Sequence, residues 1–282
     1  MTDMNKGSIG VFDSGYGGLT ILKDIRRRLP QYDYIYLGDN ARAPYGTRSF
    51  DIVYRFTLEA VRHLFSLGCP LVILACNTAS AKALRTIQQH DLPEIDPSRR
   101  VLGIIRPTVE RLGEFSSSGH IGIFGTPGTV QSESYDMEIA KLHPGFRTVG
   151  HACPMWVPLV ENGESRSPGA DFFVRQEVTR LLDKDADIDT IILACTHYPL
   201  LYDKIRREVP SRIRLLLQGE IVADSLADYL RRHPSMESRL RRSAASGEPG
   251  ACSYLTTENS LKFSSMASLF LGEPVAARTI EL

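Results

Sequence analysis

Short, uninterrupted apolar runs alternate with longer amphipathic stretches along almost the whole chain. The apolar runs that read as strands are Ser8–Phe12, Tyr34–Leu37, Leu71–Ala75, Val101–Ile105, His120–Phe124, Arg147–Val149, Thr190–Ala194 and Arg214–Leu217. Strands that are continuously Val, Ile and Leu, rather than alternating with polar residues, are typical of parallel sheets covered by helices on both faces. The pattern therefore predicts an α/β fold.

The stretches between these runs have helical spacing. In Ser49–Leu67, apolar residues such as Val53, Ala60 and Leu64 recur on one helical face. The same spacing predicts helices at Leu19–Leu29, Thr78–His90, Val130–Leu142, Asp171–Leu182, Leu200–Val209 and Glu220–Arg232. After Pro234–Gly250, which we expect to form a helix and a loop, "CSYLTT", a helix through Leu271 and "PVAARTIEL" predict one more βαβ piece that completes a sheet.

The composition excludes several classes of protein. The chain has 282 residues, 43% hydrophobic and 23% charged, which fits a soluble globular protein long enough for two domains. Lys+Arg and Asp+Glu number 33 each, so no net charge draws the protein to nucleic acid or to an anionic membrane. No apolar run approaches the ~20 residues that span a bilayer, and Met1–Gly7 lacks the apolar core of a signal peptide. The five cysteines favour free thiols in a reducing compartment, and we expect the cytoplasm.

The sequence contains an internal echo. "ILAC" occurs at Ile73–Cys76 and again at Ile192–Cys195, and "SIGVFDSGYGGLT" resembles "HIGIFGTPGTVQS". Two elements that repeat in the same order at similar offsets predict two related α/β units, although chance similarity between apolar strands is the alternative. We expect residues 1–106 together with 219–282 to form one domain, and residues 107–218 to form the other.

Reactive or hydrogen-bonding groups follow four of the predicted strands. These groups are Asp13-Ser14, Cys76-Asn77-Thr78, Gly125-Thr126 leading to Thr129, and Cys195-Thr196-His197. Ligands of open α/β sheets bind at the carboxyl ends of the strands. Each group also precedes a predicted helix, whose amino end favours anions and lowers the pKa of a thiol. The four turns therefore predict one site for an anionic ligand, with two activated thiols.

Several chemistries compete for these residues. Gly15, Gly17 and Gly18 resemble a phosphate-binding loop, but "DSGYGG" is not G-x-G-x-x-G. Two cysteines and a histidine suggest zinc, yet no further ligand has suitable spacing. A Cys-His hydrolase would leave the second cysteine without a role, and no lysine lies in a strand-end motif where it could hold pyridoxal phosphate. An amino-acid-binding protein without activity would need the polar turns but not the paired cysteines.

Two thiols in matched surroundings favour a different chemistry. Inverting a carbon requires that a proton leave one face and another arrive on the opposite face, so one acid/base group per face is needed. Cys76 and Cys195 can exchange these roles, with Asp13 and His197 as neighbours that manage protons. We expect the two sulfurs to lie roughly 6–9 Å apart, with one carbon at about 3–3.5 Å from each.

The residues at these turns resemble a known family, the cofactor-independent glutamate racemases of the aspartate/glutamate racemase superfamily. The motifs that carry the resemblance occur in order: "GVFDSGYGGLT", "GDNARAPYG", "ACNTAS", "GTPGT", "CPMWVPLVENG" and "ACTHYPLL". A tail motif, "YLTTENSLKFSSMASLFLG", extends the resemblance over nearly the full length. Aspartate racemases share the paired-cysteine plan, but the full motif set favours glutamate.

The resemblance implies a fold, a reaction and a set of site residues. It implies two pseudo-symmetric α/β domains with the active site in the cleft between them, and interconversion of L- and D-glutamate for bacterial peptidoglycan without metal or cofactor. Cys76 takes the α-proton of D-glutamate and Cys195 that of L-glutamate, assisted by Asp13 and His197. The residues implied to bind the substrate are Asp13, Ser14, Tyr45, Gly46, Asn77, Thr78, Thr126, Thr129, Thr196 and His197, with the acidic Glu161 near the site.

Two residues depart from the family pattern. Tyr16 stands where a β-branched residue is usual, and Trp156 stands where Phe is usual. We expect both to shape the mouth of the site. We also expect a homodimer with no nucleic-acid or membrane partner.

Overall fold

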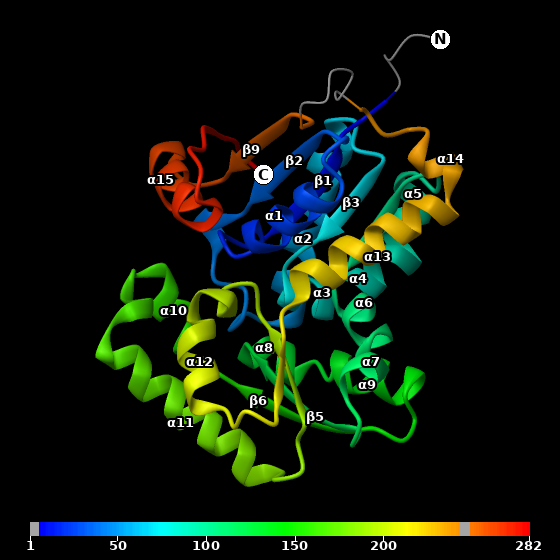
Figure 1. The fold of residues 1–282 in the computed structure, drawn as a ribbon. Helices are drawn as coiled ribbons and strands as arrows, with labels where there is room; N and C mark the ends of the chain where they lie inside the picture. The colour runs from blue at the N-terminus through cyan, green and yellow to red at the C-terminus, as the bar shows by residue number, and fades with distance from the viewer. Residues whose placement is uncertain (1–5, 243–248) are drawn as a thin grey trace.

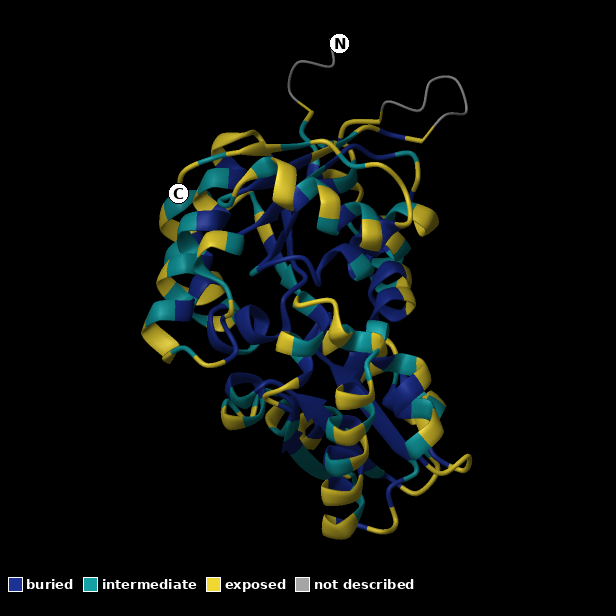
Figure 2. Ribbon diagram, turned by 90° about the vertical axis from the view of Figure 1, so that its left-hand side faces the viewer, coloured by how far each residue is buried: buried dark blue, intermediate teal, exposed yellow. Residues whose placement is uncertain are grey.

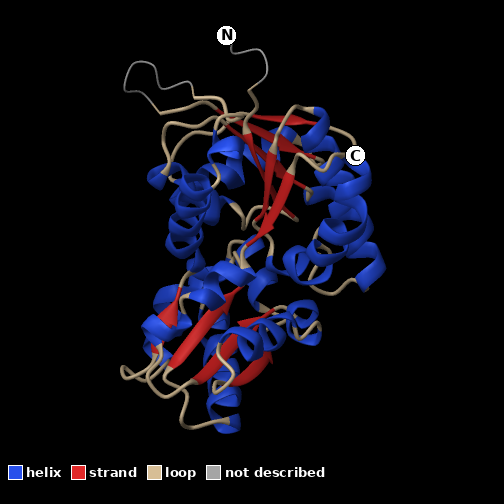
Figure 3. Cartoon of the chain, turned by 90° about the vertical axis from the view of Figure 1, so that its right-hand side faces the viewer, coloured by secondary structure: helices blue, strands red, loops and turns tan. Residues whose placement is uncertain are grey.

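The molecule contains two parallel β-sheets, each covered by helices (Figure 3). A computed structural model describes residues 6–242 and 249–282. The first sheet has the order β10-β9-β2-β1-β3-β4 and the second has the order β6-β5-β7-β8. The strands are β1 Ile9–Asp13, β2 Tyr34–Gly38, β3 Leu71–Leu74, β4 Arg100–Gly103, β5 His120–Gly125, β6 Arg147–Ala152, β7 Thr190–Ala194, β8 Arg214–Leu216, β9 Cys252–Thr256 and β10 Ala277–Thr279. Every pairing is parallel, so the predicted α/β class is confirmed.

Helices connect the strands throughout, in the arrangement shown in Figure 1. The longer ones are α1 Leu19–Arg28, α2 Phe50–Ser66, α9 Ser134–Leu142, α11 Pro168–Lys184, α12 Tyr202–Glu208, α13 Gln218–Arg232 and α15 Ser260–Leu271. The shorter ones are η2 Asn40–Arg42, α3 Asn77–Lys82, α4 Leu84–Thr86, η3 Ile87–Asp91, α5 Leu92–Ile95, α6 Ile105–Glu110, α7 Leu112–Phe115, α8 Pro127–Gln131, α10 Trp156–Glu161, η4 Glu164–Arg166, η5 Tyr198–Leu201 and α14 Pro234–Glu237. In the described part of the chain, no helix has both the length and the apolar character that crossing a bilayer requires.

The two sheets repeat one topology. The order β2-β1-β3-β4 in the first sheet matches β6-β5-β7-β8 in the second, so β1 corresponds to β5 and β3 to β7. The "ILAC" cysteines therefore follow equivalent strands, as the internal echo predicted. The first sheet has two more strands than the second, because β9 pairs with β2 and β10 pairs with β9. The tail thus extends the edge of the first sheet.

The central strands of the two sheets lie in the core and the helices cover them, as the burial pattern in Figure 2 shows. All five residues of β1 and of β7 are buried, which is why these runs carry no polar alternation. Helix α1 turns Leu19, Leu22 and Ile25 inward and leaves its basic residues outside. Each such buried side chain stabilises the fold by about 1.5–3 kcal/mol relative to an exposed one.

Two of the predicted helices are interrupted. The helix predicted at Val130–Leu142 divides into α8 and α9 at Glu133, whose φ of 52° is left-handed. Local side-chain bonds compete with the helix there: the Ser132 hydroxyl donates to the Thr129 carbonyl and accepts from the Ser134 N–H. The helix predicted at Thr78–His90 likewise divides into α3, α4 and the π-helical η3, and α3 already begins at Asn77. Part of the loop expected within Pro234–Gly250 lies outside the described residues.

Candidate active site

The four strand ends that were predicted to carry chemistry meet at one place. The Thr196 hydroxyl after β7 donates to Asp13 Oδ2 at the end of β1 over 3.4 Å. The Thr78 hydroxyl after β3 lies 3.0 Å from the Thr126 hydroxyl after β5. Both contacts join one sheet to the other, so the carboxyl ends of the two sheets face each other across the site.

Cys76 lies at the amino end of α3 and caps it. Its Sγ accepts from the Ala79 N–H at 3.4 Å and lies 3.5 Å from the Ser14 hydroxyl. Burial and the nearby Asp13 carboxylate raise the pKa of the Cys76 thiol to about 12, although both hydrogen bonds oppose this shift. The expectation that the helix start lowers the pKa of this thiol is therefore wrong, because desolvation outweighs the helix. Burial therefore favours the thiol form of Cys76 over the thiolate.

Asp13 is fully buried between the first half of the molecule, built on the sheet β10-β9-β2-β1-β3-β4, and the second half, built on the sheet β6-β5-β7-β8. Its Oδ1 accepts from the Gly15 N–H at 2.8 Å, and its Oδ2 accepts from Thr196. Burial raises the pKa of the Asp13 carboxyl, and the His197 side chain and the backbone donors oppose that shift. A carboxyl in this position can bind or release a proton close to Cys76.

Cys195, His197 and Glu161 form a chain of three groups. His197 Nδ1 lies 3.9 Å from Cys195 Sγ, and His197 Nε2 lies 3.0 Å from Glu161 Oε1, at the end of α10. Burial opposes the charged imidazolium, yet contacts with Cys195 and Glu161 raise the pKa of His197 to about 10. The His197 imidazolium therefore lies next to Cys195, where it can donate a proton.

Three threonines converge beside the cysteines. Thr129 Oγ1 lies 3.1 Å from Thr126 Oγ1 and 3.3 Å from Thr78 Oγ1. Their hydroxyls are buried and come from both halves of the molecule, and α8 begins beside them with Thr126 as its cap. Such a group of hydroxyls can donate to a carboxylate.

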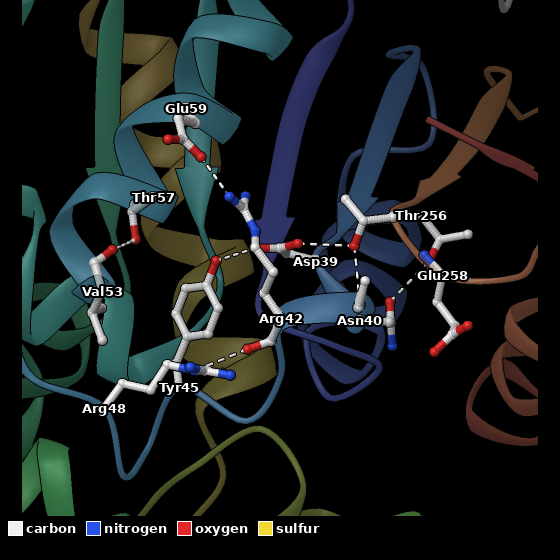
Figure 4. Close-up of polar contacts among 12 residues, drawn as sticks. Asp39, Asn40, Arg42, Tyr45, Arg48, Val53, Thr57, Glu59, Thr256 and Glu258 are labelled. Carbon is white, nitrogen blue, oxygen red and sulfur yellow. Dashed lines mark hydrogen bonds and ion pairs between the residues drawn. The ribbon is translucent and has the colours of Figure 1, made fainter. Parts of the chain in front are cut away.

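Tyr45 and Gly46 lie in a loop that a polar network holds in place (Figure 4). The buried Asp39 carboxylate accepts from the Tyr45 hydroxyl, from Arg42 Nε at 2.7 Å and, through its other oxygen, from Thr257 at 2.8 Å. The Tyr45 side chain is therefore committed to Asp39, and this loop can offer its backbone to a ligand. Gly46 reaches the second half, where its carbonyl accepts from the Gly128 N–H at 2.7 Å.

The Asn77 side chain is held by two buried partners, Tyr135 and Gln218. Asn77 Oδ1 accepts from the Tyr135 hydroxyl at 2.7 Å, and Nδ2 donates to Gln218 Oε1 at 2.7 Å. Because its amide is engaged in these buried bonds, Asn77 has only its backbone groups left to offer to a ligand at the start of α3.

The two departures from the family pattern have different environments. Tyr16 is nearly buried and packs beside Phe263 and Phe270, with ring centroids 5.4 and 6.2 Å away. Trp156 is fully buried between Phe124 and Tyr198. The expectation that Trp156 shapes the mouth of the site is wrong, because its indole belongs to the core of the second half.

The sequence reasoning missed Asp39, Gln218 and Thr257. Asp39 directly follows β2, Thr257 directly follows β9, and Gln218 comes two residues after β8. The rule that identified the first four groups, a polar residue at a strand end, would also have identified these three. A cluster of potential metal ligands, His120, Asp185 and Asp187, lies apart at the amino end of β5. Arg147 lies 3.5 Å from the Asp185 carboxylate and competes with any cation there.

Fold and site together define a pseudo-symmetric α/β protein with one thiol per half at a shared site. Residues 15–224 match the family model of the Asp/Glu/hydantoin racemases. The glutamate racemase of Roseobacter denitrificans is 40% identical over 94% of this chain and 96% of its own. The chain therefore belongs to the Asp/Glu/hydantoin racemase family, whose members are isomerases.

Solved structures agree with this assignment. Glutamate racemase isoform RacE1 from Bacillus anthracis superposes with a TM-score of 0.88 at 32% identity, covering 99% of this chain and 98% of that one. Glutamate racemase from Francisella tularensis, crystallised in complex with D-glutamate, gives a TM-score of 0.85 at 28% identity with the same coverage.

Proposed function

We propose that this protein is a glutamate racemase that interconverts L- and D-glutamate with two bases, Cys76 and Cys195. The observation that carries the proposal is the pairing of each thiol with its own proton-managing neighbour at equivalent strand ends. Asp13 accompanies Cys76, and His197 accompanies Cys195. The similarity to glutamate racemases over nearly the whole chain supports glutamate as the substrate.

We propose that racemisation of L-glutamate begins at Cys195. Burial favours the thiol form of Cys76, and the His197 imidazolium lies 3.9 Å from Cys195 Sγ, where it can exchange a proton. The Cys195 thiolate removes the α-proton from one face of L-glutamate, and the Cys76 thiol delivers its proton to the opposite face. When D-glutamate dissociates, Cys76 is a thiolate and Cys195 is a thiol.

The reverse reaction starts from that second state. Cys76 removes the α-proton of D-glutamate and Cys195 returns a proton to the other face. The two states of the free enzyme differ in the position of one proton. The Asp13 carboxyl, with its raised pKa, can hold a proton while the Cys76 thiolate exists, and His197 can do so for Cys195.

Recognition of the substrate requires donors for two carboxylates. We assign them to the hydroxyls of Ser14, Thr78, Thr126 and Thr129 and to the backbone N–H groups of the turns, including those of Gly46 and Asn77. The Asp13 carboxylate and the Thr196 hydroxyl are the polar groups placed for the ammonium. Aspartate, which is one methylene shorter, is the competing substrate.

We infer the biological setting from the same resemblance. D-glutamate would supply bacterial peptidoglycan synthesis in the cytoplasm, and the enzyme would need no metal or cofactor. We propose a division into residues 1–106 with 219–282 and residues 107–218, following the two sheets. We also propose a homodimer, as expected from the sequence.

The function is tested with purified protein and no additions. Incubation with L-glutamate should yield D-glutamate, measured by chiral chromatography, and L-aspartate in parallel should react far more slowly. Activity that EDTA abolishes and zinc restores would contradict the proposal, as would faster turnover of aspartate.

A further inference from the structure

The chain crosses between the two halves at two places, and one buried side chain contacts both crossings. The first crossing runs from β4 into α6, and the second runs from β8 into α13. Gln218, the first residue of α13, is 3% exposed. Its Nε2 donates to the Thr108 hydroxyl of α6 at 2.9 Å and lies 3.4 Å from the Ile104 carbonyl. Gln218 therefore joins the outgoing chain to the returning chain.

The same amide closes a ring of three hydrogen bonds. Gln218 Nε2 donates to the Tyr135 hydroxyl at 2.8 Å, Tyr135 donates to Asn77 Oδ1 at 2.7 Å, and Asn77 Nδ2 donates to Gln218 Oε1 at 2.7 Å. Each member donates once and accepts once within the ring, an arrangement in which the bonds strengthen one another. All three side chains are at most 3% exposed, so water cannot easily replace a lost bond.

The three members belong to different parts of the molecule. Tyr135 lies on α9 of the second half, Asn77 begins α3 of the first half, and Gln218 lies at the crossing. Asn77 directly follows Cys76, whose sulfur accepts from the first turn of α3. A rotation of one half against the other must break the ring or move α3, and α3 carries the thiol.

We propose that Gln218 and Tyr135 are positioning residues that fix the Cys76 thiol relative to the second half. This inference rests on the proposed racemase function and deepens it. Neither thiol is a member of the ring. It holds the start of α3, so that Cys76 stands opposite Cys195 at the separation that proton transfer requires. Loss of the ring should impair proton transfer at the Cys76 face more than at the Cys195 face.

Two substitutions remove the ring with little change of shape. Gln218→Met keeps the length of the side chain, and Tyr135→Phe removes one hydroxyl. Each should lower kcat/KM by about 10- to 100-fold, because a misplacement of about 1 Å is enough to cost that much. The double variant should lose no more than the stronger single variant, because both substitutions break the same ring. The matched control is Tyr34→Phe, which removes a buried hydroxyl whose bond to the Leu29 carbonyl lies at the amino end of β2.

Isotope effects locate the damaged step. L- and D-glutamate have equal free energies, so kcat/KM must fall equally in the two directions and rates alone cannot identify a face. In both ring variants, the primary deuterium isotope effect on kcat/KM should increase with D-[2-²H]glutamate and decrease with L-[2-²H]glutamate. Tyr34→Phe should leave both effects at the wild-type values.

The outcomes separate the two levels of the proposal. A wild-type protein that does not racemise glutamate refutes the proposed function. A wild-type protein that does, with ring variants that melt at lower temperature but keep the wild-type isotope effects, refutes the positioning role and leaves the function intact. If Gln218→Met fails to fold, the isotope effects of Tyr135→Phe alone decide the test.

Discussion

The Thr196 hydroxyl lies 3.4 Å from the Asp13 carboxylate, so the turn that carries the second cysteine is tied to the end of the first strand. Asp13 also receives the Gly15 N–H, and His197 lies close enough to oppose the rise in its pKa. One carboxyl thus connects the proton-managing groups of the two halves.

Replacing Asp13 by Asn should impair the Cys76 face selectively. Burial raises the pKa of the Asp13 carboxyl, so it can exchange a proton that an amide cannot. Elimination from a D-glutamate analogue with a leaving group on Cβ needs only one deprotonation, and we expect it to slow by about 10²–10⁴-fold. Elimination from the L-analogue should be much less affected. Equal losses for both analogues would mean that Asp13 only binds the ammonium and does not carry a proton for Cys76.

Replacing Glu161 by Gln should lower the pKa of His197. Glu161 lies 3.0 Å from His197 Nε2 and stabilises the imidazolium, which persists until the pH rises through about 10. Without that carboxylate the imidazolium should lose its proton at a lower pH. The basic limb of the pH profile for elimination from the L-analogue should shift in the same direction, and NMR titration of His197 gives the pKa directly. An unchanged titration would mean that Cys195 alone sets the pKa of His197.

Gly17 permits the close contact between the first turn and the Cys195 turn. A Cβ atom there would lie 2.2 Å from Thr196 Oγ1 and 2.5 Å from His197 Nδ1, so Gly17→Ala must displace one of these groups. We expect racemisation to fall by about 100-fold with the fold retained. The control is Gly145→Ala, where a Cβ meets nothing within 4 Å. Steady-state kinetics and circular dichroism of both variants check this, and a fully active Gly17→Ala enzyme would show that the turn adapts.

Trp156 should affect stability and not substrate affinity. Its indole packs 4.9 Å from the Phe124 ring and 4.8 Å from the Tyr198 ring, in the core of the second half. Trp156→Ala should lower the free energy of unfolding by about 3–5 kcal/mol, measured by urea denaturation. The KM for glutamate of the folded enzyme should stay at the wild-type value. A large change in KM with unchanged stability would place the indole at the site.

Most of the fold could be predicted because its signals are local. Continuous apolar runs such as Thr190–Ala194 mark strands buried on both faces, and the "ILAC" echo marks the repeat. The break at Glu133 could not be predicted, since it depends on side-chain bonds of Ser132 that compete with the helix. The spacing of apolar residues predicts the ends of helices to within a few residues. It does not predict where a helix is interrupted, as between α3 and α4.

The site could be predicted to the level of residue type and strand end. Its electrostatics could not, because the pKa of the Cys76 thiol depends on burial and on the distance to Asp13, neither of which a motif encodes. The direction of the Asn77 side chain is likewise set by Tyr135 and Gln218, distant in sequence. Both the pKa of Cys76 and the direction of the Asn77 side chain therefore depend on contacts between residues that are distant in sequence.

The most direct test of the two-base account is the fate of the α-proton in D₂O. We predict that L-glutamate gives D-glutamate carrying deuterium at Cα, while the remaining L-glutamate stays protonated at early conversion. Cys76→Ser and Cys195→Ser should each lose racemisation almost as fully as the double variant, since two groups acting as a unit are not additive. Each single variant should retain elimination from one enantiomer of the Cβ analogue, L for Cys76→Ser and D for Cys195→Ser. Racemisation near the wild-type rate in either single variant would contradict the account.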